Sequence, residues 1–174
     1  MHDGEFFPVI LVGIGANLAG PSGGPAAMVE AGLAALDGGG VRVVRRSRLW
    51  SSPAWPPSDQ PPYVNAVALV ETALSPADLL ARLHAIEAEL GRVRGERWAA
   101  RTLDLDLLAY RDRILRPAAE GGLAIPHPRM ADRAFVLLPL ADIAPDWRHP
   151  ETGRSLSDLV AALPPDHQTV PLIP

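Results

Sequence analysis

The chain has 174 residues, of which 48% are hydrophobic, a formal net charge of -4 and no cysteine. The lack of cysteine excludes disulfides, thiolate zinc sites and a cysteine nucleophile. All 16 basic residues are arginine, which excludes a phosphate-loop lysine, a lysine Schiff base and a lysine general base. The acidic balance argues against a broad nucleic-acid surface, which normally needs a basic face.

Length and hydropathy predict a single domain over residues 1–174. Domains most often contain about 100–150 residues, and no apolar run approaches the roughly 20 residues that cross a bilayer. Residues 1–7 lack the basic start and the cleavage site of a secretory signal, and we expect them to be a flexible extension. We therefore expect a cytoplasmic protein that binds neither membranes nor nucleic acid, and we further expect it to be a monomer.

The first half of the chain predicts a strand, a helix and a second strand, followed by a long loop. The apolar run at residues 9–12 leads into Gly13-Ile-Gly15-Ala-Asn17, which predicts a buried strand and a tight turn toward a helix. These glycines do not fit a dinucleotide-binding motif. A helix is predicted over residues 26–36 and a strand over 41–50. The prolines of residues 52–62 predict an irregular loop.

The second half predicts a strand over residues 63–72, a helix capped by Ser75, and a strand over 102–110. A further helix is expected from about 132 to 143, and a weak one near 155–163. The order β-α-β-β-α-β is that of the ferredoxin-like split β-α-β arrangement. We therefore predict an α+β fold in which an antiparallel sheet packs on helices, with a helical addition at the C-terminus.

Two carboxylates are the most informative feature of the sequence. Asp104 and Asp106 lie two residues apart in a predicted strand, so they share one face of the sheet. Asp is depleted in strands, and two of them repel each other. A cation is therefore expected there, either a hard divalent metal such as Mg²⁺ with a polyphosphate, or an arginine cluster. The alternative is a solvated strand face neutralised by Arg101.

Aromatic and polar side chains elsewhere suit a flat ligand. Tyr63 and Asn65 share a strand face and could stack on and hydrogen-bond a heterocycle, although a strand tyrosine often belongs to the core. Trp98 lies between arginines and could stack on a nucleobase, or it could anchor its loop in the core. His127, between two prolines, suits a contact with phosphate or ribose, or a structural role.

These motifs occur together and in order, and the chain resembles the 6-hydroxymethyl-7,8-dihydropterin pyrophosphokinases. Enzymes of that family transfer diphosphate from ATP to a pterin alcohol in folate biosynthesis. The motifs that carry the resemblance are Gly13-Ile-Gly-Ala-Asn-Leu18, Asp59-Gln-Pro-Pro-Tyr-Val-Asn65, Glu87 with Gly91-Arg-Val-Arg94, Glu96-Arg-Trp98, Arg101-Thr-Leu-Asp-Leu-Asp106, and Ile125-Pro-His-Pro-Arg-Met130 followed by Arg133 and Phe135.

The resemblance implies a role for each matched residue. Asp104 and Asp106 would hold two Mg²⁺ ions against ATP, the co-substrate, and Arg92 and Arg101 would complete the catalytic set. The residues expected around ATP are Glu87, Arg94, Arg97, Trp98, His127 and Arg133. The residues expected around the pterin are Ser52, Pro53, Trp55, Tyr63, Asn65 and Phe135, with the ring between Tyr63 and Phe135.

Some positions depart from the family pattern, and other functions fit the acidic pair. Ser52 replaces a common threonine, Trp55 begins a Trp-Pro-Pro-Ser segment where many relatives have a glycine-containing turn, and Gly122 and Ala124 stand where some relatives have Arg and Thr. A nucleotidyltransferase would share the two aspartates but release diphosphate in place of AMP. A non-enzymatic nucleotide-binding domain is the third interpretation.

Overall fold

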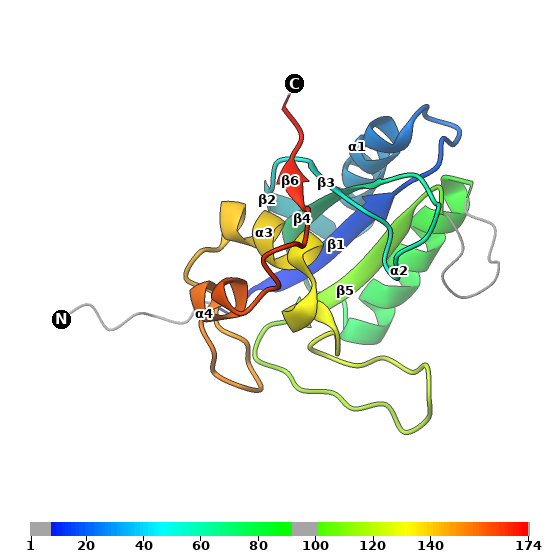
Figure 1. The fold of residues 1–174 in the computed structure, drawn as a ribbon. Helices are drawn as coiled ribbons and strands as arrows, with labels where there is room; N and C mark the ends of the chain where they lie inside the picture. Colours follow the sequence, from blue (N-terminus) through cyan, green and yellow to red (C-terminus); the bar gives the residue numbers. More distant parts are fainter. Residues whose placement is uncertain (1–7, 92–100, 174) are drawn as a thin grey trace.

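The structure is a computed structural model that describes residues 8–91 and 101–173. Figure 1 shows the arrangement of its helices and strands. No helix in the described part of the chain is long and apolar enough to cross a membrane. The elements, in chain order, are β1 (Ile10–Ala16), α1 (Pro25–Leu36), β2 (Val41–Arg46), β3 (Trp50–Ser52), β4 (Tyr63–Thr72), α2 (Pro76–Glu89), β5 (Asp104–Tyr110), a 3₁₀ turn (Met130–Asp132), α3 (Ala134–Ile143), α4 (Leu156–Ala161) and β6 (Val170–Pro171).

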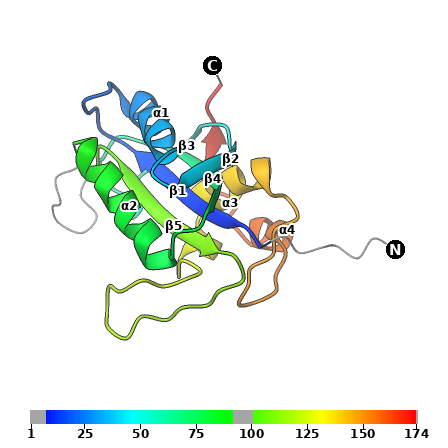
Figure 2. The same ribbon diagram turned by 180° about the vertical axis from the view of Figure 1, so that it is seen from behind.

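A six-stranded sheet organises the fold. Its order is β5-β1-β4-β3-β6, with β2 also paired to β4, and every pairing is antiparallel. Helices α1 and α2 cover one face, as Figure 2 shows, whereas α3 and α4 lie on the other. The predicted α+β fold of the ferredoxin-like type is confirmed, including the helical addition at the C-terminus.

Strand alternation divides the core into two layers. In β1, Ile10, Val12 and Ile14 pack toward α1 and α2, and Leu11 packs toward α3. Gly13 and Gly15 lie on the α3 face with Leu11, because residues two apart share a face. A Cβ at Gly15 would lie 3.1 Å from the Asn65 Oδ1 atom, and one at Gly13 would lie 3.3 Å from the Leu108 side chain. Glycine therefore leaves room on this face for a ligand.

The predicted strand over residues 41–50 is two strands, β2 and β3. Ser47 lies between them, where its backbone N–H donates to the Val67 carbonyl and its hydroxyl accepts from the Val67 N–H, both at 2.9 Å. The side chain thus replaces one bond of the regular ladder, and the chain changes course. The ten-residue strand β4 pairs with both segments.

The remaining elements either match their predicted boundaries or differ from them by a few residues. Strand β4 has the predicted range, and Ser75 caps α2 by accepting a hydrogen bond from the Asp78 N–H at 3.1 Å. The helix expected from about residue 132 begins at Ala134, after the 3₁₀ turn. Strand β6 was not predicted, because two residues carry no measurable periodicity.

Candidate active site

Strand β5 carries both aspartates into the space beside α3. Leu105 and Leu107 are 2% and 3% exposed in the core below α1 and α2, so Asp104 and Asp106 face the other way. Their cross-strand partners on β1 are Gly15 and Gly13. Partners in an antiparallel pair share a face, so each carboxylate lies beside a position without a side chain. The predicted shared face is confirmed.

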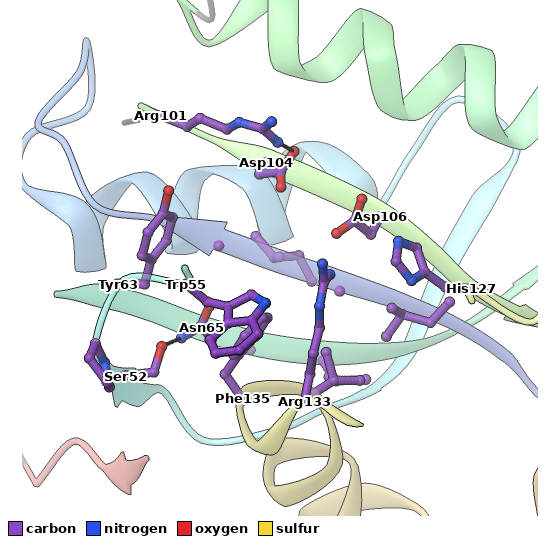
Figure 3. Close-up of a pocket in the computed structure, with 18 residues that line it drawn as sticks. Ser52, Trp55, Tyr63, Asn65, Arg101, Asp104, Asp106, His127, Arg133 and Phe135 are labelled. Atoms are coloured by element: carbon purple, nitrogen blue, oxygen red, sulfur yellow. Dashed lines mark hydrogen bonds and ion pairs between the residues drawn. The ribbon is translucent and has the colours of Figure 1, made fainter. Parts of the chain in front are cut away.

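A cavity of about 240 Å³ opens at this place. Figure 3 shows the side chains that line it. The expected pterin residues Ser52, Pro53, Trp55, Tyr63, Asn65 and Phe135 all line the cavity. Of the expected catalytic and ATP residues, Arg101, Asp104, Asp106, His127 and Arg133 also line it. Arg92, Arg94, Arg97 and Trp98 lie outside the described residues.

The two carboxylates differ in their surroundings. Asp104 forms an ion pair with Arg101, at 2.7 Å between the Arg101 Nη1 and Asp104 Oδ1 atoms. Desolvation, with the negative charge of Asp104, raises the pKa of Asp106 to about 7, and Arg133 and Arg101 only partly oppose this. The arginines within the described residues therefore only partly offset the cost of charging Asp106.

The donor set fits Mg²⁺. Among residues 8–91 and 101–173, no group of three or more His, Cys, Asp or Glu side chains could hold a metal ion, so the protein ligands there would be the two aspartates. Mg²⁺ usually takes only one or two carboxylates and keeps water or phosphate oxygens in its other positions. A hard cation bound with a polyphosphate suits this pair.

Arg133 provides a cationic group on the opposite wall. Burial lowers its pKa, and Asp106 offsets this only in part. Its Nε atom is buried and has no hydrogen-bond partner within the described residues, and its guanidinium lies 5.4 Å from the centre of the Phe135 ring. A buried guanidinium with an unpaired donor is suited to an incoming phosphate oxygen.

His127 is uncharged at neutral pH. Burial and the nearby Arg133 lower its pKa to about 4. Its backbone N–H donates to the Leu108 carbonyl at 2.8 Å, and its Nδ1 atom accepts from the Arg129 N–H at 3.2 Å. The imidazole can therefore donate a hydrogen bond from Nε2 without adding charge to the cavity.

The other end of the cavity is aromatic. Asn65 and Ser52 are 5% and 3% exposed, and the Asn65 Nδ2 atom donates to the Ser52 hydroxyl at 2.8 Å. Tyr63, Trp55 and Phe135 lie around this pair (Figure 3). A fixed amide among aromatic rings suits a flat heterocycle with hydrogen-bonding groups on its edge.

Asn17 joins two parts of the site, a role that the sequence did not reveal. Its Nδ2 atom donates to the Gln60 side chain at 3.1 Å and to the Pro61 carbonyl at 3.2 Å. Its Oδ1 atom accepts from the Arg101 N–H at 2.9 Å. The side chain is buried and links the loop before β4 to the segment that enters β5. The one available signal was its place in the Gly-Ile-Gly-Ala-Asn motif.

Glu87, which was expected around ATP, does not line the cavity. The side chain projects from α2, is 3% exposed and accepts a hydrogen bond from the Leu105 N–H at 2.7 Å. It therefore holds the backbone between Asp104 and Asp106, and it is not among the residues that line the cavity. A direct contact with ATP stays a prediction.

The fold and the cavity define an α+β domain with an acidic and arginine-lined site next to an aromatic pocket. Residues 11–145 match the family model described as "7,8-dihydro-6-hydroxymethylpterin-pyrophosphokinase (HPPK)". The chain belongs to this family, and the resemblance found in its motifs is confirmed.

Curated relatives agree with this assignment. The chain is 46% identical over 156 residues to the 2-amino-4-hydroxy-6-hydroxymethyldihydropteridine pyrophosphokinase of Pseudomonas aeruginosa, covering 89% of this chain and 91% of that protein. It is 45% identical over 152 residues to the protein of the same name from Synechocystis, covering 86% and 73%.

Solved structures show the same fold at low sequence identity. A crystal structure of Plasmodium falciparum HPPK-DHPS with pteroate superposes with a TM-score of 0.67 at 11% identity and covers 89% of this chain. The present chain spans 44% of that longer protein.

Proposed function

We propose that this cavity is the site at which the protein, a pyrophosphokinase of folate biosynthesis, transfers diphosphate from ATP to the hydroxymethyl group of 6-hydroxymethyl-7,8-dihydropterin and releases AMP. One observation carries the proposal: a single cavity, in a chain of this family, is lined by the Asp104 and Asp106 pair and by the Tyr63, Asn65 and Phe135 pocket.

The aromatic end of the cavity binds the pterin in this proposal. Tyr63 and Phe135 supply stacking area, and Trp55, which is 57% exposed, covers the open side. Because the Asn65 amide nitrogen donates to Ser52, its Oδ1 atom is directed to accept from a donor on the heterocycle. Main-chain groups at Ser52 and Pro53 complete the contact with the polar edge. A ligand without matching groups would leave buried polar atoms unpaired, which gives selectivity.

The charged end binds the triphosphate of ATP. Asp104 and Asp106 would hold two Mg²⁺ ions, which supply charge neutralisation at the phosphates when bound. Arg101 and Arg133 bring further positive charge to the phosphate oxygens. The remaining residues assigned by family resemblance are Arg92 in catalysis and Glu87, Arg94, Arg97, Trp98 and His127 in ATP binding.

The reaction is an in-line displacement at the β-phosphorus. The hydroxymethyl oxygen forms a new bond to this phosphorus and loses its proton, and the bond from the β-phosphorus to the oxygen that bridges to the α-phosphate breaks. That oxygen leaves with AMP. Positioning and charge neutralisation account for most of the rate enhancement in such transfers.

The proposal extends to the whole chain. Residues 1–174 act as a single domain and as a monomer in the cytoplasm, with ATP and the pterin as small-molecule partners. One sheet with helices on both faces supports the single-domain interpretation.

One assay tests the function: the purified protein is incubated with Mg²⁺, ATP and 6-hydroxymethyl-7,8-dihydropterin, and the products are separated. We expect AMP and pterin diphosphate in equal amounts. Release of free diphosphate with an adenylated acceptor would instead identify a nucleotidyltransferase. Ligand binding without any product would identify a non-enzymatic domain. Isothermal titration should show tight pterin binding only when an Mg-ATP analogue is present.

A further inference from the structure

A polar cluster outside the cavity joins α3 to β3. It consists of Asp142, Arg48 and Trp50, which we call the α3 anchor. The Asp142 Oδ2 atom accepts from the Trp50 Nε1 atom at 2.9 Å and from the Arg48 backbone N–H at 3.2 Å, and its Oδ1 atom accepts from the Arg48 Nη2 atom at 2.8 Å. The Arg48 guanidinium also lies 5.2 Å from the centre of the Trp50 ring.

The three residues of the α3 anchor contribute unequally to holding α3 on β3. Trp50 is 8% exposed, and a charge-assisted bond from its indole is partly shielded from water. The Arg48 side chain is 62% exposed, whereas that of Asp142 is 15% exposed. Exposed ion pairs contribute little. Within the cluster, the bond between Trp50 and Asp142 should therefore contribute most to the position of the helix on β3.

Trp50 is next to the heterocycle pocket in the sheet. In the β3–β4 register it pairs with Asn65, and Ser52 pairs with Tyr63. Residues two apart on a strand, and direct cross-strand partners, share one face. Trp50 therefore lies in the same row of side chains as Ser52 and Asn65, whose mutual hydrogen bond forms one wall of the cavity.

The other end of α3 carries the facing wall. Phe135 is in its first turn and lines the cavity (Figure 3). Asp142 follows Phe135 by seven positions, which is about two helical turns, or roughly 10 Å along the axis. The two side chains therefore project from the same side of α3. A helix released at Asp142 can tilt or slide on the sheet and displace Phe135.

We propose that Asp142 is a positioning residue for heterocycle binding: by holding α3 on Trp50 of β3, it sets the separation between Phe135 and the Ser52–Asn65 pair. The inference rests on the proposed function and assigns a substrate-specific task to a residue outside the cavity. The carboxylates at the ATP end lie on β5, across β1 and β4 from the α3 anchor. Arg133, the N-cap of α3, moves with the helix, but Asp104 and Asp106 do not, so the effect should fall on the pterin more than on ATP.

The test measures pterin affinity and steady-state kinetics for Asp142→Ala and Trp50→Phe. For Asp142→Ala, we expect the pterin KM, and the pterin Kd in the presence of an Mg-ATP analogue, to rise about tenfold, with the ATP KM and kcat within about twofold of wild type. Trp50→Phe keeps an aromatic ring but removes the N–H donor together with the pyrrole part of the indole, so a rise of about threefold is expected. Combining both changes should add little to Asp142→Ala alone, because both remove the same bond.

Two controls separate positioning from general destabilisation. Arg48→Ala leaves the bond between Trp50 and Asp142 in place and should keep the pterin KM near wild type. Val29→Ala, in the core under α1, should lower the melting temperature and leave the pterin KM unchanged.

Unchanged pterin affinity in both Asp142→Ala and Trp50→Phe would overturn the inference, as would an equal rise in the ATP KM. If Asp142→Ala does not fold, Trp50→Phe alone decides. Wild-type protein is assayed in parallel. If the proposed function is wrong, wild type forms no AMP, and this result is distinguishable from failure of the positioning role, in which wild type forms AMP and the variants bind the pterin as it does.

Discussion

The two faces of the sheet are built from the same strands but have opposite chemistry. The face under α1 and α2 is packed with apolar side chains such as Met28, Leu83 and Leu103, each fully buried. The other face is apolar only where α3 and α4 cover it. Beyond Phe135 it opens into the cavity with Asp104 and Asp106.

This difference shows how one small domain accommodates a costly site. Burying like charges and unpaired polar groups destabilises a protein. A continuous apolar layer on the first face stabilises the sheet independently of the second. Strand alternation lets β1, β4 and β5 contribute to both layers, so the site needs no separate scaffold.

Removing a carboxylate should have the largest effect on turnover and should leave the packing of the face under α1 and α2 unchanged. We call the face that carries the cavity the open face. We expect Asp104→Ala and Asp106→Ala each to lower turnover by about a thousandfold or more, because charge neutralisation at the phosphates is lost. AMP release measures the effect, and circular dichroism checks that the fold is intact. Normal AMP release by either purified variant would contradict the metal assignment.

Truncating a side chain of the packed face should show the converse. Leu83→Ala removes a fully buried side chain of α2 and should lower the free energy of unfolding by about 3 kcal/mol. Urea denaturation gives this value. Both substrate KM values should stay near wild type at temperatures where the variant is folded. A large rise in either KM under these conditions would show that the two faces are not independent.

The pH dependence of stability should reveal the cost of the open face. The pKa of Asp106 is raised from 3.8 to about 7 in the folded protein. The folded state therefore binds more protons than the unfolded state between these values, and this group makes the free energy of unfolding fall as the pH rises through that window. In EDTA, Asp106→Asn should be more stable than wild type by on the order of 2 kcal/mol above pH 7 and equally stable near pH 4.

Comparing wild type with Asp106→Asn cancels the effect of His127 on the free energy of unfolding, which has the opposite pH dependence. The lowered pKa of His127 makes stability rise with pH between about 4 and 6.5 in both proteins. Parallel stability curves for wild type and Asp106→Asn would contradict the raised pKa of Asp106.

A smaller effect is expected at Asn17, where the open face meets its loops. Asn17→Ala should lower kcat/KM by about tenfold, because the Arg101 backbone and the loop at Pro61 lose a common partner. Asn17→Asp is the matched variant: it keeps an acceptor for the Arg101 N–H and loses both amide donors. An activity of Asn17→Asp equal to that of Asn17→Ala would show that the donors alone matter.

Local features of the fold were predictable from the sequence. The Ser75 cap, the range of β4 and the shared face of Asp104 and Asp106 depend on neighbours a few residues away. The division of residues 41–50 into two strands was not predictable, since it depends on bonds between Ser47 and Val67 across the sheet.

The sequence predicted which residues line the site better than it predicted the hydrogen bonds between distant segments that hold them in place. Family motifs identified the side chains that line the cavity. Asn17 and Asp142 act through partners more than 40 positions away in the sequence, and no local pattern indicates which segments become neighbours. The placement of Glu87 in the core likewise depends on how α2 packs against β5.

The hydrogen bond from the Leu105 N–H to Glu87 has a further consequence for behaviour in solution. Strand β5 is at the end of the sheet, paired with β1. Outward N–H groups on a terminal strand can recruit a strand from another molecule and begin aggregation. Because Glu87 occupies the Leu105 donor, the strand that carries both aspartates is protected at this position against intermolecular pairing.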